Sequence, residues 1–181
     1  DRPVLHAQPA LHDQSVHQLI VAPAGLMHSL GDYVAFKQAR LGSAELVILE
    51  EAINAGELLA REHSEQDTDD AARLKHYLFD RWKRDHFTHV LLVGDADVLP
   101  VRYMVLDRKT NPAFDYAFYP SDLYYADLAR RDGSFDDWNA QKDGFHRRYF
   151  GEVRGEANKG DPINFDGVDY RPEIAVGRWP V

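Results

Sequence analysis

The chain has 181 residues, 44% of them hydrophobic, and a formal net charge of −9 at pH 7 with histidine counted as neutral. This length and composition suit one ordinary domain with a buried core. The acidic balance argues against a nucleic acid or an anionic membrane as partner, since neutralising phosphates requires a basic surface. No apolar run approaches the ~20 residues that span a bilayer, so we expect no membrane span.

The chain contains no cysteine and nine scattered histidines. The lack of cysteine excludes a thiol nucleophile, a disulfide and cysteine-ligated zinc within these residues. No two histidines have the His-x-x-x-His spacing, with a Glu between them, that places two metal ligands on one helix face, so we do not expect a shared histidine metal site. Because the chain begins at Asp1 and not at methionine, we expect a processed or trimmed piece of a longer protein.

The first part of the chain predicts an arm, a strand and a helix. Residues 1–17 are polar and lack a sustained period, so we expect an N-terminal arm, followed by one α/β subdomain over residues 18–181. The apolar run 19–22 predicts a strand buried on both faces. Apolar residues at helical spacing then predict a helix up to Gly42, with Ser29 and Asp32 as its capping pair.

The next part predicts two further strands around a helix. Residues 45–49 and 89–94 are the β-rich runs, and the polar stretch 50–66 is predicted as a loop with a helical turn. Thr68 is the predicted N-cap of the helix, whose apolar stripe is Ala71, Leu74, Leu78 and Trp82. Three buried strands joined by helical crossovers predict an α/β fold with a Rossmann-like, three-layer parallel sheet and helices on both faces.

The character of the sequence changes after Asp95. Prolines and clustered aromatic residues predict an added aromatic β-hairpin and not another crossover helix. Residues 130–169 are rich in Asp, Gly and Asn, which favour turns. Residues 173–178 predict a fourth short strand.

Acidic residues after the third strand form a first candidate site, the strand-end acidic cluster: Asp95, Asp97 and Asp122. Ligands of open α/β sheets gather beyond the carboxyl ends of the strands, so these carboxylates could bind a cation or polarise a partner. Alternatively, Asp95 and Asp97 only cap turns, while Asp122 bonds backbone amides beside a packed Tyr124.

A second candidate is a calcium site formed by Asp137, Asn139, Asp143 and Glu152. Oxygen side chains at nearby loop positions, with a later Glu, can wrap Ca²⁺. The spacing departs from an EF-hand, because three residues separate Asn139 from Asp143. The alternative is a solvated acidic loop, and no organic cofactor is expected.

Four motifs, in order, resemble the N-terminal part of the catalytic unit of the gingipain-type cysteine peptidases, a bacterial family whose fold is similar to that of caspases. The resemblance covers roughly residues 17–181. The motifs are Phe36-Lys37-Gln38-Ala39-Arg40-Leu41-Gly42, Val90-Leu91-Leu92-Val93-Gly94-Asp95-Ala96-Asp97-Val98-Leu99-Pro100, Pro120-Ser121-Asp122-Leu123-Tyr124-Tyr125, and Pro172-Glu173-Ile174-Ala175-Val176-Gly177-Arg178-Trp179-Pro180-Val181.

The resemblance implies a parent protein that is a secreted or cell-surface bacterial cysteine endopeptidase acting on proteins through a Cys/His acyl-enzyme. In that family two α/β subdomains lie side by side, and the catalytic His and Cys belong to the second. That second, catalytic subdomain, absent here, is then the expected partner, and this fragment alone is expected to be inactive. The family's acidic residue that orients the His matches Glu173, and calcium often stabilises its members.

Two alternatives stay open. The chain could be a non-catalytic peptidase-like module that serves in binding or secretion. It could instead be a Mg²⁺-dependent phosphoryl-transfer domain that uses Asp95 and Asp97, which the proline-rich and aromatic segment after them fits poorly.

Overall fold

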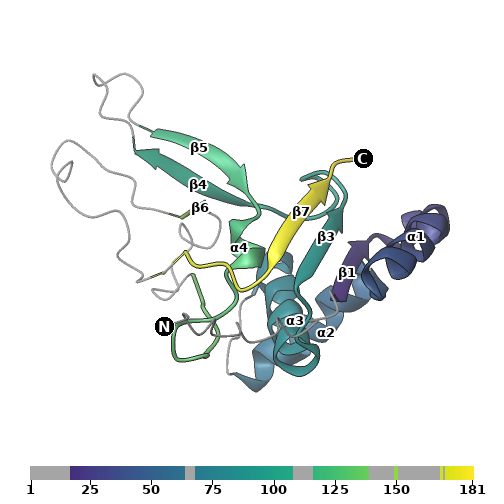
Figure 1. Cartoon of the computed structure of the whole chain (residues 1–181). Coiled ribbons are helices and arrows are strands. Elements are labelled where there is room, and N and C mark those ends of the chain that lie inside the picture. The colour runs from purple at the N-terminus through teal and green to yellow at the C-terminus, as the bar shows by residue number, and fades with distance from the viewer. Residues whose placement is uncertain (1–16, 64–67, 108–115, 139–148, 151–167, 169) are drawn as a thin grey trace, which may run out of the picture.

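A four-stranded parallel sheet is the centre of the fold (Figure 1). The computed structural model describes residues 17–63, 68–107, 116–138, 149–150, 168 and 170–181. The strand order is β2-β1-β3-β7, which confirms the predicted parallel α/β architecture. The strands are β1 (His17–Ala22), β2 (Ser43–Ile48), β3 (His89–Val93) and β7 (Ala175–Trp179).

Helices cover both faces of this sheet, as the sequence predicts. On one face lie α2 (Leu49–Glu62) and α3 (Asp70–Asp85), and on the other η1 (Ala24–Leu30) and α1 (Gly31–Leu41). Alternate residues of the central strand β1 point into two hydrophobic cores: Leu19 and Val21 into the first, Ile20 and Ala22 into the second. This double burial is why the strand is a continuous apolar run.

The predicted loop over residues 50–66 is wrong, because helix α2 occupies most of that stretch. Its apolar residues recur at helical spacing and are buried: Leu49, Ala52, Gly56 and Ala60. A β-carbon on Gly56 would come within 1.8 Å of the Arg73 carbonyl oxygen, so α2 and α3 pack in direct backbone contact. The acidic residues between the apolar ones belong to its solvent face.

Both predicted N-caps also need correction. Helix α1 begins at Gly31 after the 3₁₀ turn η1, and its N-cap Leu30 makes no side-chain capping bond. The N-cap of α3 is Asp69 and not Thr68, since its carboxylate accepts the Ala72 amide at 3.0 Å. The predicted C-terminal cap of α1 is confirmed, with Gly42 in the left-handed region at φ +83°.

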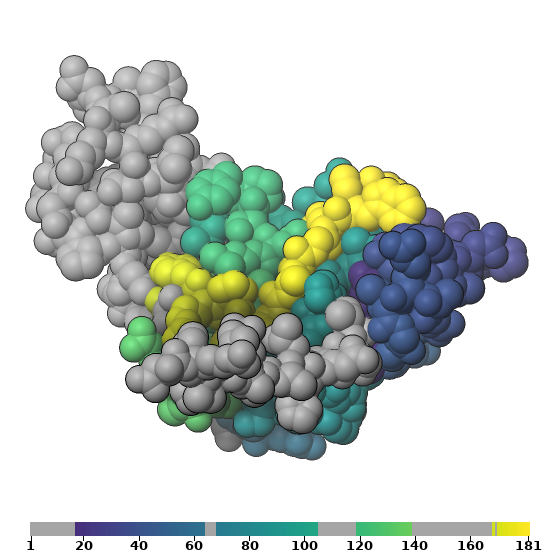
Figure 2. Space-filling view, in the orientation of Figure 1, coloured from purple at the N-terminus to yellow at the C-terminus, as the bar shows by residue number. Residues whose placement is uncertain are grey.

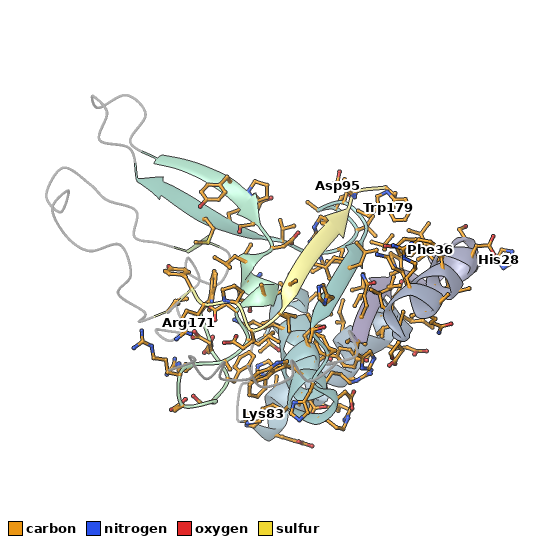
Figure 3. The ribbon with its side chains drawn as sticks, viewed as in Figure 1. His28, Phe36, Lys83, Asp95, Arg171 and Trp179 are labelled. Atoms are coloured by element: carbon orange, nitrogen blue, oxygen red, sulfur yellow. The ribbon has the colours of Figure 1, made fainter. Side chains whose placement is uncertain are left out.

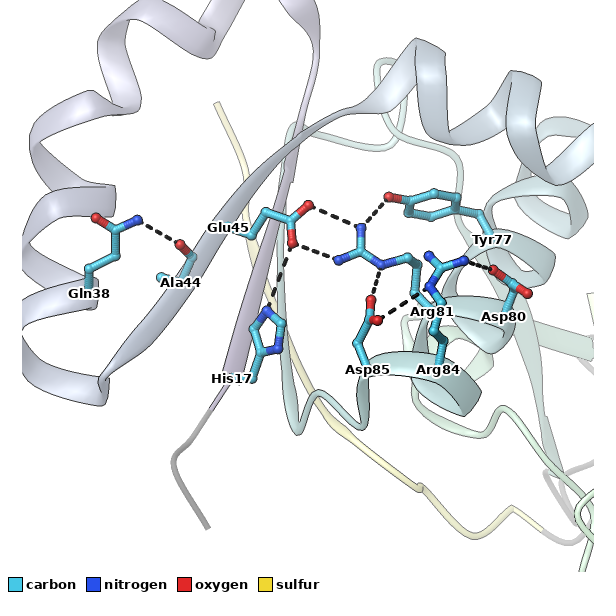
Figure 4. Close-up of polar contacts among 9 residues, drawn as sticks. All are labelled: His17, Gln38, Ala44, Glu45, Tyr77, Asp80, Arg81, Arg84 and Asp85. Carbon is cyan, nitrogen blue, oxygen red and sulfur yellow. Dashed lines mark hydrogen bonds and ion pairs between the residues drawn. The ribbon is translucent and has the colours of Figure 1, made fainter. Parts of the chain in front are cut away.

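A charged network joins β2 to α3 (Figure 4). Arg81 donates to both carboxylate oxygens of Glu45, at 3.1 and 2.6 Å, and to the Tyr77 hydroxyl at 2.8 Å. It also forms an ion pair with Asp85, one turn along α3. His17, at the start of β1, lies 3.9 Å from Glu45. These contacts fix the register between the helix and the amino ends of the strands.

The predicted β-hairpin is confirmed, and it projects away from the parallel sheet (Figure 1). Its strands β4 (Arg102–Asp107) and β5 (Tyr116–Ser121) are antiparallel. A short strand, β6 (Tyr149–Phe150), pairs in parallel with β4. The one-turn helix α4 (Leu123–Ala126) follows β5 and buries Tyr124 and Tyr125 in the first core.

Strand β7 forms an edge of the parallel sheet, and Figure 2 shows its surface uncovered on the visible face. Ala175, Gly177 and Trp179 are exposed, whereas the residues between them are half-buried. In the part of the chain that the structure describes, no helix is both long and apolar enough to cross a membrane.

Candidate functional site

The loop after β3 lies at the carboxyl end of the parallel sheet. It begins at Gly94, where φ is +136°, and the Gly94 amide donates to the Trp179 carbonyl at 3.0 Å. The Asp95 carboxylate accepts the next amide at 2.7 Å and is exposed to solvent, as is Asp97. Figure 3 shows Asp95 and Trp179 together at this end of the sheet. The geometry at Asp95 is that of a turn-capping aspartate.

Arg178, near the end of β7, forms hydrogen bonds with the backbone of this loop. Its guanidinium donates to the carbonyl oxygens of Gly94 and Leu99, both at 2.9 Å, and to that of Pro100 at 3.4 Å. It also forms a bidentate pair with the Asp122 carboxylate, at 2.8 and 2.7 Å. Planar guanidinium and carboxylate groups match in this way with high geometric specificity. One side chain therefore ties the strand-end loop, β7 and the turn after β5 together.

The members of the strand-end acidic cluster have different environments. Asp122 is paired with Arg178 and accepts no backbone amide from the residues that the structure describes, which corrects that alternative within this part of the chain. Tyr124 is buried, as the same alternative expected. Asp95 and Asp97 face solvent. Among the residues that the structure describes, no group of three or more His, Cys, Asp or Glu is placed to hold a metal ion.

A buried arginine, Arg102, also lies beside this loop. Arg102, at the start of β4, is 3% exposed and donates to both oxygens of Asp69 at 2.8 and 2.6 Å. Its guanidinium also lies 4.7 Å from the centroid of the Tyr124 ring. Next to this pair is a pocket of about 310 Å³, whose lining residues are Asp69, Asp70, Ala96, Pro100, Val101, Arg102 and Tyr103.

A buried tyrosine forms a hydrogen bond with the last residue of this loop. Tyr125 donates its hydroxyl proton to the Pro100 carbonyl at 2.6 Å. Burial raises the pKa of the Tyr125 phenol well above its ordinary value, so the group stays a donor over the physiological range. With Arg178, it satisfies carbonyl groups that would otherwise be buried without partners.

Glu173 lies at the opposite, amino end of β7. Its Oε2 accepts the amides of Leu128 and Ala129 at 2.7 and 3.0 Å, and its own amide donates to Ala126 at 2.9 Å. The carboxylate therefore holds the segment after α4 against the start of β7. The paired stretch of β7, roughly 13 Å long at about 3.3 Å per step, separates it from Asp95.

Of the four residues predicted to bind calcium, Asn139, Asp143 and Glu152 lie outside the described residues. Asp137 is described and half-buried. Its contribution to a calcium site therefore stays a prediction.

The sequence alone predicts no role for Arg102, which is buried, or for Arg178, which is half-buried. Arg178 is the one charged residue of strand β7, and a charged residue in an apolar strand signals a polar partner. That signal does not identify Asp122, because 56 positions separate the two residues along the chain. Arg102 and Asp69 are likewise 33 positions apart.

These features define a doubly wound α/β domain whose carboxyl-edge loop is fixed by the half-buried Arg178. A family model described as peptidase family C25 matches residues 11–181, and the chain therefore belongs to this family, the gingipain family of cysteine peptidases. The predicted resemblance is thereby confirmed. No curated protein and no solved structure matches the chain.

Proposed function

We propose that this chain is the supporting N-terminal subdomain, over residues 18–181, of a secreted or cell-surface bacterial cysteine endopeptidase. The carrying observation is the family match over residues 11–181 in a sequence that contains no cysteine. A cysteine peptidase attacks the peptide carbonyl with a thiolate, and a histidine shuttles the proton. The thiolate must then be supplied by residues outside these 181, in a catalytic subdomain of the same polypeptide.

The exposed edge strand β7 favours the proposal that this chain is a supporting subdomain. Its surface is open, with Trp179 45% exposed, and it is the strand whose Arg178 fixes the loop at the carboxyl edge. A neighbouring subdomain packed on this edge would meet a rigid surface, because the loop is bonded to the strand below it. Protein or peptide is the proposed substrate class.

Glu173 is the proposed orienting carboxylate for the catalytic histidine, by its place in the family motif. One of its oxygens holds two backbone amides. The second oxygen is the one proposed to face the histidine. Calcium binding by Asp137, Asn139, Asp143 and Glu152 is proposed as a stabilising contribution, and no catalytic step depends on it.

The test is peptide hydrolysis by the full polypeptide that carries these residues. A fluorogenic peptide library should be cleaved, and iodoacetamide should abolish cleavage by alkylating the thiolate. The matched control is a variant of the full polypeptide in which the proposed nucleophilic cysteine is replaced by alanine. A folded full polypeptide without thiol-dependent hydrolysis would instead support the non-catalytic binding or secretion module, which the lack of cysteine also favours. Membership of a peptidase family does not favour the phosphoryl-transfer alternative.

A further inference from the structure

One segment, residues 126–138, holds Glu173 beside the amino end of β7, and we call it the clamp segment. Helix α4, whose last residue begins this segment, lies beside β7 (Figure 1). The Glu173 Oε2 accepts the amides of Leu128 and Ala129 at 2.7 and 3.0 Å. The Glu173 amide donates to the Ala126 carbonyl at 2.9 Å. No residue within the described ranges donates to the second oxygen, Oε1, so this half-buried carboxylate is fixed in direction with one oxygen left for a further donor.

The two amides belong to a buried hairpin within the clamp segment. Leu128 and Ala129 are 0% and 2% exposed. The Leu128 carbonyl accepts the Asp136 amide at 3.0 Å, and Ala129 pairs with Phe135 in an antiparallel bridge. Turning the two N–H groups away from the carboxylate would break these backbone hydrogen bonds where little water can replace them. The hairpin therefore holds the amides in a constant direction.

Trp138 fixes the clamp segment from its other end. Its indole N–H, the one donor of this side chain, donates to the Asp127 carboxylate at 3.1 Å, and both residues are 0% exposed. Asp127 directly precedes the two amides. The Trp138 ring also packs edge-on against the rings of Tyr124 and Tyr170, with centroids 5.4 and 5.2 Å away. Tyr170 precedes Glu173 by three positions, so one buried ring contacts the chain on both sides of the carboxylate site.

We propose that Trp138 is a positioning residue that acts through Asp127 and the two amides to fix the orientation of the Glu173 carboxylate. The donor to Oε1 is then the imidazole N–H of the histidine in the catalytic subdomain, so this inference rests on the proposed function. A carboxylate orients an imidazole only while its own direction is fixed, and a misplacement of about 1 Å costs about 100-fold in rate. Glu173 accepts a hydrogen bond in this role and takes up no proton, and Trp138 touches no reacting atom.

A double-mutant cycle on kcat in the full polypeptide tests this assignment. Trp138→Phe keeps an aromatic ring and removes the indole N–H, so kcat for peptide hydrolysis should fall about tenfold while KM changes less than about twofold. In a Glu173→Gln background the same substitution should lower kcat by less than about twofold, because the orienting carboxylate is already lost. The matched control is Leu30→Ala, which truncates a buried side chain of the second core and should leave kcat within about twofold of the wild type.

The outcomes separate this inference from the proposed function. A wild type without thiol-dependent hydrolysis overturns the proposed function, and the role of Trp138 with it. An active wild type whose kcat Trp138→Phe leaves unchanged, or lowers equally in both backgrounds, overturns the role of Trp138 alone.

If Trp138→Phe does not fold, amide hydrogen exchange in the wild-type polypeptide decides. Protection of the Leu128 and Ala129 amides within about tenfold of the β3 amides supports a fixed clamp segment. Protection as low as that of exposed loops overturns it.

Discussion

Arg178 and Asp122 form a bidentate ion pair, with donor–acceptor distances of 2.8 and 2.7 Å, that joins the edge strand of the parallel sheet to the turn after β5. The arginine also holds two loop carbonyls at 2.9 Å. Its side chain is 14% exposed. This pair is therefore better shielded from solvent than an ordinary surface ion pair.

Replacing the arginine should cost considerable stability. Arg178→Met leaves the Asp122 carboxylate without its partner and the loop carbonyls without donors, so we expect the free energy of unfolding to fall by about 3 kcal/mol. Urea denaturation measures it. The control is Arg84→Met, whose side chain is 60% exposed and should change stability by less than about 0.5 kcal/mol. Equal effects of the two substitutions would show that the Arg178 contacts add nothing to the free energy of unfolding.

Asp69 has two roles that one substitution removes together. It caps α3 and balances the buried Arg102, so Asp69→Ala should lower the free energy of unfolding by about 4 kcal/mol. Asp70→Ala is the control, because that carboxylate is 60% exposed. It should cost about 1 kcal/mol or less. A loss at position 69 no larger than at position 70 would contradict the buried-pair argument.

Two substitutions of Glu173 distinguish a structural role of this carboxylate from a catalytic one. Glu173→Gln retains an oxygen for the Leu128 and Ala129 amides, so the fold should persist, whereas Glu173→Ala should cost about 2 kcal/mol of stability. In the full polypeptide, an orienting role requires Glu173→Gln to lower kcat and shift its pH profile while KM stays unchanged. Wild-type kcat in a folded Glu173→Gln protein would leave only the structural role.

Gly56 permits the close approach of α2 to α3. A methyl group there would collide with the Arg73 backbone, so Gly56→Ala should destabilise the protein by about 3 kcal/mol despite the better helix propensity of alanine. Gly31→Ala places the same methyl where no atom lies within 4 Å. Thermal unfolding of both variants compares the sites, and similar melting temperatures would refute the close-packing interpretation.

Calcium binding is tested by thermal unfolding with and without millimolar Ca²⁺. An ion that binds only the folded state raises the melting temperature, by about 3 °C or more if its concentration is well above the dissociation constant. Magnesium, which demands tighter octahedral coordination, should have a smaller effect. Asp143→Asn should abolish the shift; a shift that survives this substitution would exclude the predicted ligand set.

The main elements of the fold could be predicted from local patterns. The continuous apolar run from Leu19 to Ala22 indicates a doubly buried strand, and the stripe of α3 has helical spacing. Leu49, Ala52 and Ile53 of helix α2 also follow helical spacing, so the predicted loop over residues 50–66 overlooked a local signal that the acidic residues between them obscure. The caps at Leu30 and Asp69 depend on where each helix actually begins, which side-chain type alone does not define.

The sequence by itself determined the fold class, the parallel strands and the family, because hydrophobic periodicity and ordered motifs are local properties of the chain. Only the tertiary structure decided which charged and polar side chains interact. It paired Arg178 with Asp122 and Arg102 with Asp69, placed Lys75 among three aromatic rings, and brought the Glu173 carboxylate to the amides of Leu128 and Ala129. Such contacts join residues distant in the chain, and their strength comes from burial, which the packed core alone creates.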